Sequence, residues 1–396
     1  MKKHFLLTIA LVVATLTGAW AATVTFADPL TDGHEGQGTI YYQLNTDTKE
    51  ATVVAGTWQY TKNIFIPDEV EYNGEPYAVT KIAAYAFRNS YDLDLVHLGA
   101  NVHTIESNAF YMCGTTDRPV TINFDSDGLE VLQSNAINQV VLSPNRGDSI
   151  VFGKNVKQLG DASATSTSNW CSWGTRLGVR YYGVEEGNAY FCSVDGVLYN
   201  KDKTRLISYP RSNSATSFVI PSTVTTVCTY AFQNVQNITT ITGGENVVRI
   251  GSVVSGSITS FPVGPKVTSM SATAFMYCAY GFLPVVDDAN PRFKLKGSPQ
   301  TGYALYDYNY TVKDDPTVYI ALCRYFRTVN VATFKIPADV TYIADYAFYS
   351  HPYVKYVDFQ DCTGLRSSKI AGTAFHSTTY SVQFLNADNI FANVDG

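Results

Sequence analysis

The side chains that could do chemistry are few and widely spaced in this sequence of 396 residues. Beyond the first 21 residues, the histidines are His34, His97, His103, His351 and His376. None of them lies in an HExxH, GxSxG, P-loop or GxGxxG pattern. His97 and His103 belong to one repeated segment and could face a ligand, but histidines at such positions are usually solvated surface residues.

Two short stretches resemble pieces of known sites. Cys171 stands between Trp170 and Trp173, a setting reminiscent of a cysteine nucleophile, but a tryptophan pair packed on the fold is the simpler interpretation. The run from Asp125 to Gly128 resembles part of a calcium loop, but it lacks the third ligand and the spaced glutamate, so we predict a turn. The sequence therefore predicts no catalytic, cofactor-binding or metal-binding residues and no enzyme activity.

The seven cysteines are best interpreted as small buried side chains. An odd number with no regular spacing argues against a disulfide framework, and no C-x-x-C pair indicates zinc. Cys113 and Cys278 each lie three residues after an Ala-Phe pair, so they occupy equivalent positions in two repeats. Because a free thiol behaves as a small hydrophobic group, we expect both to fill the same position in the core.

A repeated frame positions these side chains, and the stretch FVIPSTVTTVCTYAF, from Phe218 to Phe232, shows it most clearly. Counted back from the closing residue, the frame has apolar residues at −14 and −12, Pro or Gly at −11, apolar residues at −8 and −5, and then Ala-Phe. Intact, loose and degenerate units are mostly 20 to 27 residues apart. They close at Phe87, Phe110, Ile137, Ala164, Phe232, Ser255, Phe275, Phe348 and Phe375.

The frame predicts stacked coils rather than one compact globule. Alternation at −14 and −12 indicates a short strand with one face inward, and Pro or Gly ends that strand where the chain turns. The −8 and −5 residues start a second inward run, and Ala-Phe places a ring in the core. One unit cannot bury this face alone, so the units must stack. A period in the low twenties is typical of leucine-rich repeats. We predict a mainly β repeat solenoid with short helical turns.

Three regions depart from the frame. Residues 187–210 read as a β-hairpin insertion, and a second insertion from Asn290 onward contains a strand at residues 302–306. Residues 22–80 contain paired strands at 40–44 and 51–54 and an Asn73-Gly74 hairpin signal. The predicted domains are a signal peptide (1–21), an N-terminal β cap (22–80) that covers the first coil, and the solenoid (81–396).

The first 21 residues have the features of a cleavable signal peptide. Lys2 and Lys3 precede an apolar run, and Ala19-Trp20-Ala21 offers a cleavage site after Ala21. The apolar run is shorter than the roughly 20 residues that cross a bilayer, and no later segment is apolar enough. Without the two lysines the chain has 26 basic and 34 acidic residues, a net charge of −8. We expect a secreted or cell-surface protein with no nucleic-acid partner and no membrane insertion of the mature chain.

The units FVIPSTVTTVCTYAF and FKIPADVTYIADYAF, with the insertion VDGVLYNKDKTRLISYP, resemble the BspA-like branch of bacterial leucine-rich repeats. The resemblance covers roughly residues 60 to 396, and Cys113 and Cys278 stand where that family's repeat commonly has a cysteine. It implies a surface or secreted protein of mouth or gut bacteria, a family in which some members are adhesins for host matrix proteins or other cells. It supplies no catalytic residues.

The outward residue of each strand, at −13, is where we expect recognition of a partner. The row is mixed and partly apolar with no charge stripe, so it favours a protein over a polyanion. We therefore expect an adhesin that binds host or microbial proteins through a solenoid face. The abundant tyrosines leave a glycan-binding surface module as the alternative. The row consists of His97, Val151, Val219, Thr242, Pro262 and Lys335.

The end of the chain repeats an internal pattern. The residues from Phe391 to Gly396 match those from Phe191 to Gly196 at Phe, Val, Asp and Gly. The earlier copy continues into a hairpin, and a solenoid that stopped in mid-unit would expose its core. We therefore expect the native protein to continue past Gly396.

Overall fold

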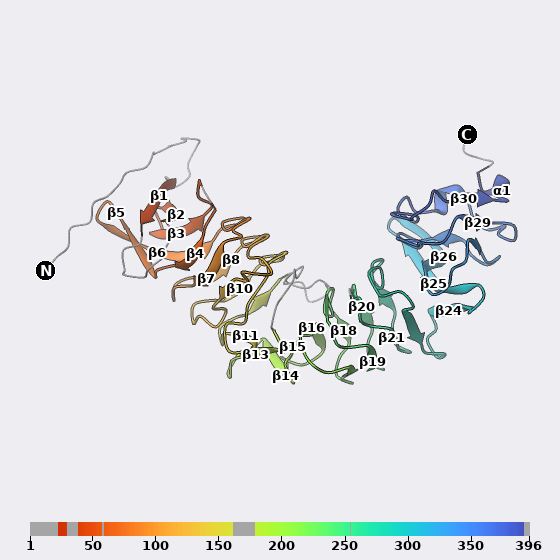
Figure 1. The fold of residues 1–396 in the computed structure, drawn as a ribbon, viewed down its shortest axis with the longest axis horizontal. Helices are drawn as coiled ribbons and strands as arrows, with labels where there is room; N and C mark the ends of the chain where they lie inside the picture. The colour runs from red at the N-terminus through yellow and green to blue at the C-terminus, as the bar shows by residue number, and fades with distance from the viewer. Residues whose placement is uncertain (1–22, 30–38, 58, 161–178, 254, 392–396) are drawn as a thin grey trace. The chain divides into compact units, whose positions relative to one another are not determined.

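The computed structural model describes residues 23–29, 39–57, 59–160, 179–253 and 255–391 (Figure 1). Its contacts divide the chain into two compact units, Met1–Asp202 with Ser208–Asn213, and Lys203–Ile207 with Ser214–Gly396. The predicted signal peptide, the segment around Cys171 and the last five residues lie outside the described residues. No helix of the described residues is long and apolar enough to span a membrane.

The first unit begins with antiparallel β-structure. Its strands are β1 (Thr23–Pro29), β2 (Thr39–Asn45), β3 (Glu50–Val54), β5 (Glu69–Tyr72) and β6 (Glu75–Ile82). Both strand pairs expected in this region are present, β2 with β3 and β5 with β6. Asn73 and Gly74 join β5 to β6 with φ of 53° and 82°, the left-handed geometry of an Asn-Gly hairpin turn. The boundary at residue 80 stays a prediction.

Coils with two short strands each make up most of the rest of this unit. One row of strands contains β4 (Lys62–Phe65), β7 (Leu93–His97), β9 (Thr121–Ile122), β11 (Ser149–Phe152) and β13 (Tyr181–Val184). The other continues β6 through β8 (Thr104–Ile105), β10 (Val131–Leu132) and β12 (Gln158–Leu159). Within these rows the pairs between coils are parallel. β14 (Phe191–Val194) and β15 (Val197–Asn200) form an antiparallel hairpin in the first predicted insertion.

The second unit repeats this plan (Figure 1). One parallel sheet contains β16 (Arg205–Ser208), β18 (Thr226–Val227), β20 (Arg249–Ile250) and β22 (Ser269–Met270). A second contains β17 (Ser217–Ile220), β19 (Thr240–Gly243), β21 (Ser260–Val263) and β23 (Leu283–Val286). A third contains β27 (Thr333–Lys335), β29 (Tyr356–Asp358) and β30 (Gln383–Leu385).

The second insertion is an antiparallel three-stranded meander of β24 (Phe293–Ser298), β25 (Gly302–Val312) and β26 (Asp315–Tyr325). β26 then pairs parallel with the coil strand β28 (Tyr342–Ile343). Among the described residues, helix is confined to a 3₁₀ turn at Ser367–Lys369 and to α1 (Asp388–Phe391). The predicted mainly β repeat solenoid is confirmed.

The repeated frame accounts for the core of each coil. In the stretch from Phe218 to Phe232, the side chains of Ile220 and Val227 are buried, whereas Val219, which precedes Ile220, is 64% exposed. The ring of the closing residue Phe232 lies 6.0 Å from the ring of Phe261 on β21, and the ring of Phe261 lies 5.8 Å from the ring of Phe275. Aromatic pairs at such separations stabilise beyond the area they bury. The rings from Phe218 to Phe275 therefore form a ladder along these coils of the second unit.

The turns around Phe87, Phe110, Ile137, Phe232 and Phe348 each contain two left-handed residues, and the turn at Phe375 contains one. Positive φ recurs two positions before the closing residue, a backbone conformation that L-residues other than Asn and Asp rarely adopt. It recurs again two positions after it. The first set is Tyr85, Asn108, Asn135, Tyr230 and Tyr346, and the second is Asn89, Met112, Gln139, Asn234, Ser350 and Ser377. The sequence frame did not predict this geometry.

The glycines that end several strands permit close contact between coils. A Cβ atom on Gly264 would lie 2.8 Å from the carbonyl oxygen of Gly244 in the preceding coil. A Cβ atom on Gly99 would lie 2.7 Å from the carbonyl oxygen of Ile66. Glycine at −11 therefore ends the strand and also lets neighbouring backbones approach.

Candidate functional site

The histidines expected to be surface residues do not form a site. His97 is exposed on β7, where its ring lies 5.8 Å from the ring of Phe65 on β4. His103 is half-buried in the turn before β8, and its carbonyl oxygen accepts backbone hydrogen bonds from Glu130 and Val131. In the part of the chain that the structure describes, no group of three or more His, Cys, Asp or Glu side chains could hold a metal ion.

The predicted turn at residues 125–128 is present, and its carboxylates have protein partners. Asp125 forms an ion pair with Arg146 at 2.5 Å, and Asp127 with Lys154 at 3.2 Å. The turn is compact because Gly128 passes close to the carbonyl of Ala100. These ion pairs neutralise the two carboxylates, so both acidic side chains have a structural role in the turn.

The cysteines behave as the frame predicts. Cys113 and Cys278 are buried, and each thiol donates a hydrogen bond to a backbone carbonyl of an earlier coil, Phe87 at 2.8 Å and Val253 at 3.3 Å. Burial raises the pKa of both thiols to about 12. A protonated thiol is a poor nucleophile and a poor metal ligand. No disulfide bond joins any two of the six cysteines that the structure describes.

The same position holds a histidine in a later coil. His351 lies three residues after Ala347-Phe348 and is fully buried, with its ring stacked 4.6 Å from that of Tyr325. Its Nδ1 atom accepts a hydrogen bond from the backbone N–H of Val354 at 3.3 Å. Burial, with contributions from Arg324 and Arg327, lowers the pKa of His351 to about 4. The equivalence with Cys113 and Cys278 is visible in the sequence once units are aligned on Ala-Phe.

The outward row at −13 is confirmed as solvent-facing or partly so. In the second unit it becomes a continuous line, because parallel pairing places Val219 beside Thr242 and Pro262 beside Val285. Val219 is 64% exposed and Val285 62% exposed. We call Val219, Thr242, Pro262 and Val285 the strand row. Its four side chains carry no charge.

A second surface, which the sequence reasoning missed, lies on the turns after the closing residues. We call it the tyrosine edge, and it consists of Tyr277, Tyr280, Tyr349, Tyr353 and His376. Tyr277 is 48% exposed and Tyr280 is 56% exposed. The hydroxyl of Tyr349, followed by burial, raises the pKa of Tyr277 to about 12. The sequence did contain a signal for this surface, because a tyrosine follows the closing residues Phe275 and Phe348 by two positions and one position. The repeated frame missed it because the frame ends at Ala-Phe.

Arg324 in β26 and Arg327, just after β26, lie against the tyrosine edge. Arg324 is only 6% exposed, and its guanidinium donates to the carbonyl oxygens of Tyr346 at 2.8 Å and Met276 at 3.0 Å. Arg327 donates to the carbonyl oxygen of Cys278. No carboxylate of the described residues forms an ion pair with either arginine. Burial, together with the positive charge of Arg327, lowers the pKa of Arg324 to about 10. The two side chains therefore tie together turns that are far apart in sequence.

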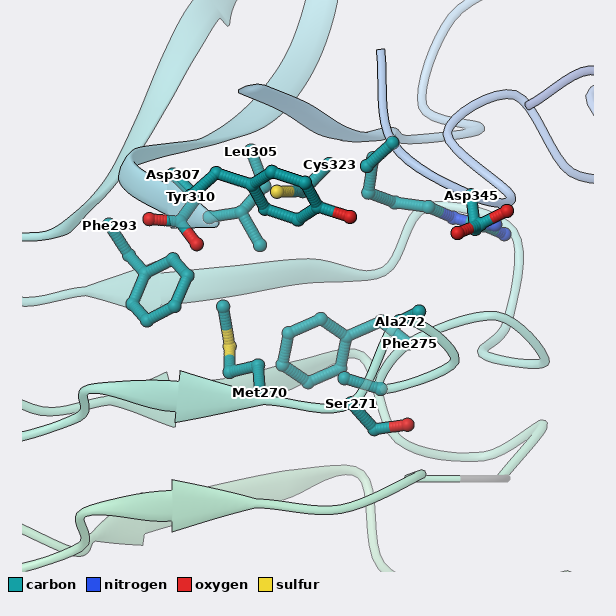
Figure 2. A pocket seen from close by; sticks show the side chains of 13 residues that line it. Met270, Ser271, Ala272, Phe275, Phe293, Leu305, Asp307, Tyr310, Cys323 and Asp345 are labelled. Carbon is teal, nitrogen blue, oxygen red and sulfur yellow. The ribbon is translucent and has the colours of Figure 1, made fainter. Parts of the chain in front are cut away.

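A cavity of about 180 Å³ lies where the second insertion meets the coils (Figure 2). Met270, Phe275 and Phe293 give it apolar walls, and charged groups reach it from the insertion and from the later coil. Asp307 is 3% exposed, and both of its oxygens accept hydrogen bonds from Arg292 at 2.7 Å. The carboxylate of Asp345 accepts a hydrogen bond from Thr373 at 2.5 Å. Since protein groups hold these charges, we interpret the cavity as a packing gap beside the insertion.

Comparison with known proteins gives one family. The model of the BspA type leucine rich repeat region matches the chain in six copies, over residues 61–163, 208–280 and 320–393. Curated proteins give no significant match.

Several solved structures are similar to the chain. A leucine rich cell surface protein from Faecalibacterium prausnitzii is 20% identical over 92% of this chain and 87% of that one, with a TM-score of 0.38. A leucine-rich repeat protein from Eubacterium ventriosum is 16% identical over 91% and 96%, with a TM-score of 0.41. The pneumococcal vaccine antigen PcpA is 14% identical over 87% and 97%, with a TM-score of 0.36.

Proposed function

Because this chain belongs to the BspA-type leucine-rich repeat family, we propose that it is a secreted or cell-surface adhesin that binds an extracellular protein. Export is supported by the basic start, the apolar run and the Ala19-Trp20-Ala21 cleavage site of the first 21 residues. We propose no enzymatic role, since the histidines, thiols and acidic groups named above are dispersed, buried or paired. The same repeat scaffold serves many ligands, so the surface must indicate the partner.

The strand row is the observation that carries this proposal. Val219 is 64% exposed and Val285 is 62% exposed, and strand pairing holds them in one line with Thr242 and Pro262. Protein interfaces are depleted in charge at their centre. A rigid, uncharged line on a parallel sheet suits a protein surface. A polyanion would need cations there, and the mature chain has a net charge of −8.

The test uses the mature chain from residue 22 on immobilised fibronectin, fibrinogen, laminin and collagen, with a glycan array in parallel. The variant Val219→Asp/Val285→Asp introduces charge into the centre of the row. We expect it to weaken binding to the matrix protein by at least about tenfold. Val318→Asp is the matched control, because Val318 is a valine that is 56% exposed on β26, away from the row.

Circular dichroism and the unfolding midpoint establish that each variant is folded. Unchanged binding by the folded double variant would remove the strand row as the binding face. Binding to glycans with no binding to any of the four proteins would overturn the adhesin proposal in favour of the glycan-binding alternative.

A further inference from the structure

The tyrosine edge is built from three turns that are separate in sequence and neighbours in the fold. They comprise residues 276–282, 349–355 and 375–381. Tyr277 contacts Tyr349 at a ring separation of 5.5 Å, and Tyr280 contacts Tyr353 at 6.3 Å. The ring of Tyr349 in turn stacks on that of His376 at 5.8 Å. The rings therefore form one surface across three turns rather than scattered exposed residues.

The orientation of the rings leaves faces as well as edges at the surface. The Tyr277 and Tyr349 rings meet at 75°, and the Tyr280 and Tyr353 rings at 83°. In an edge-to-face pair only one face of one ring is covered by the other ring, so further ring faces stay available. The exposed fractions of 48% for Tyr277 and 56% for Tyr280 agree with this geometry.

The charge of these turns differs from that of the chain as a whole. The mature chain has a net charge of −8, but residues 276–282, 349–355 and 375–381 contain no Asp or Glu. Lys355 is exposed and lies 4.7 Å from the ring centre of Tyr380, the next tyrosine along this side. The polar groups of the edge are therefore mainly phenol and aliphatic hydroxyls, among them Ser377 and Thr379.

The surface is also held in place before any ligand binds. Arg324 donates hydrogen bonds to the carbonyl oxygen of Met276, which precedes Tyr277, and to that of Tyr349, whose ring is central in the edge. Its guanidinium lies 5.7 Å from the Tyr349 ring centre. Tyrosine side chains have few rotatable bonds, so ordering them at a binding surface costs little entropy. A preorganised surface retains more of its contact energy as affinity.

We propose that the tyrosine edge is a glycan-binding site for a neutral oligosaccharide or polysaccharide, distinct from the strand row. The C–H faces of pyranose rings stack on exposed aromatic faces, and sugar hydroxyls exchange hydrogen bonds with tyrosine, serine and threonine hydroxyls. A neutral glycan needs no counter-charge, and the edge offers only Lys355 and His376 beside the buried arginines.

The experiment titrates the mature chain with laminarin, mannan, dextran, xyloglucan and chitohexaose by affinity electrophoresis and calorimetry. We expect one of these neutral glycans to bind, and Tyr277→Ala/Tyr280→Ala to weaken binding by at least about tenfold, because the sugar rings lose their stacking partners. Tyr277→Phe/Tyr280→Phe keeps the rings and should retain most of the affinity. Tyr85→Ala/Tyr91→Ala is the matched control, since these tyrosines are 46% and 41% exposed in the first unit.

Three outcomes would overturn the proposal: no binding to any of the five glycans at millimolar concentration, binding that the folded Tyr277→Ala/Tyr280→Ala variant retains, or binding to heparin alone. If that variant instead loses binding to a matrix protein while no glycan binds, the edge is a protein-binding surface. The strand-row variant Val219→Asp/Val285→Asp should leave glycan binding unchanged, so failure of this proposal and failure of the adhesin proposal give different results.

Discussion

The thiol of Cys113 donates a hydrogen bond to the carbonyl oxygen of Phe87, the closing residue of the preceding coil, at 2.8 Å. This bond crosses from one repeat to the next, and Cys278 and Cys362 make similar bonds to Val253 and Val340. The Phe87 carbonyl also accepts a hydrogen bond from the backbone N–H of Ser90 at 3.1 Å, so the thiol provides its second hydrogen bond. The cysteine therefore fills a core position and also supplies a donor at the return turn, which a purely apolar residue could not do.

Cys113 and Cys278 should resist alkylation in the folded protein. The pKa of each thiol is raised to about 12 by burial, so the reactive thiolate is scarce at pH 8, and the sulfur is also inaccessible. Mass spectrometry of iodoacetamide-treated protein should show little modification of either peptide until urea is added. Cys192, which is half-buried, is the internal comparison and should react first. Equal labelling of all three in native buffer would contradict the buried thiol assignment.

His351 should make the second unit less stable in mild acid. The folded pKa is about 4, below the ordinary value of 6.5, because burial disfavours the imidazolium. The unfolded chain therefore binds the proton more readily than the folded chain between pH 6.5 and pH 4. The contribution is complete above pH 6.5 and is lost as the pH falls to 4, by up to about 3 kcal/mol. Urea unfolding midpoints measured at half-unit pH steps should follow this direction.

The control for this effect is His351→Cys, because cysteine occupies the equivalent position in the coils of Cys113 and Cys278. The variant leaves a gap beside Tyr325 and should be less stable at pH 7. Its midpoint should nevertheless fall less steeply between pH 6.5 and pH 4 than that of the wild-type chain. Identical slopes would show that carboxylates, not His351, cause the acid sensitivity.

Phe232→Ala should destabilise the second unit far more than Val219→Ala. The Phe232 ring is fully buried between Phe218 and Phe261, and removing such a ring costs about 3–5 kcal/mol. Val219 is 64% exposed in the same unit, so its truncation should change stability by no more than about 0.5 kcal/mol. Urea unfolding gives both values. Comparable losses would contradict the inward and outward assignment of the frame.

Gly264→Ala should destabilise the protein although alanine is otherwise well tolerated. The new Cβ atom would lie 2.8 Å from the carbonyl oxygen of Gly244, a contact that only backbone movement relieves. We expect a loss of about 1–3 kcal/mol, typical of overpacking. Gly372→Ala is the control, because a Cβ atom there meets nothing within 4 Å. A Gly264→Ala protein as stable as the Gly372→Ala protein would show that the coils can separate at no cost.

The sequence by itself determined the repeat and its inward residues. In the stretch from Phe218 to Phe232, the buried Ile220, Val227 and Phe232 and the exposed Val219 follow from the frame alone. The reason is that each coil packs mainly on its neighbours, so local spacing decides which side chains face the core. The cysteine position after Ala-Phe was predictable for the same reason, and aligning the later coils would have placed His351 there.

Only the tertiary structure decided which side chains meet across coils and insertions. Arg324 reaches the carbonyl of Met276 across 48 residues, because the second insertion returns the chain to an earlier turn. The pairing of Tyr277 with Tyr349 depends on that return. The frame determines whether one residue faces inward, but contacts between surface side chains depend on which coils become neighbours and on how the left-handed turns aim their residues. For that reason the sequence identified the solenoid, whereas the tyrosine edge became visible only in the folded chain.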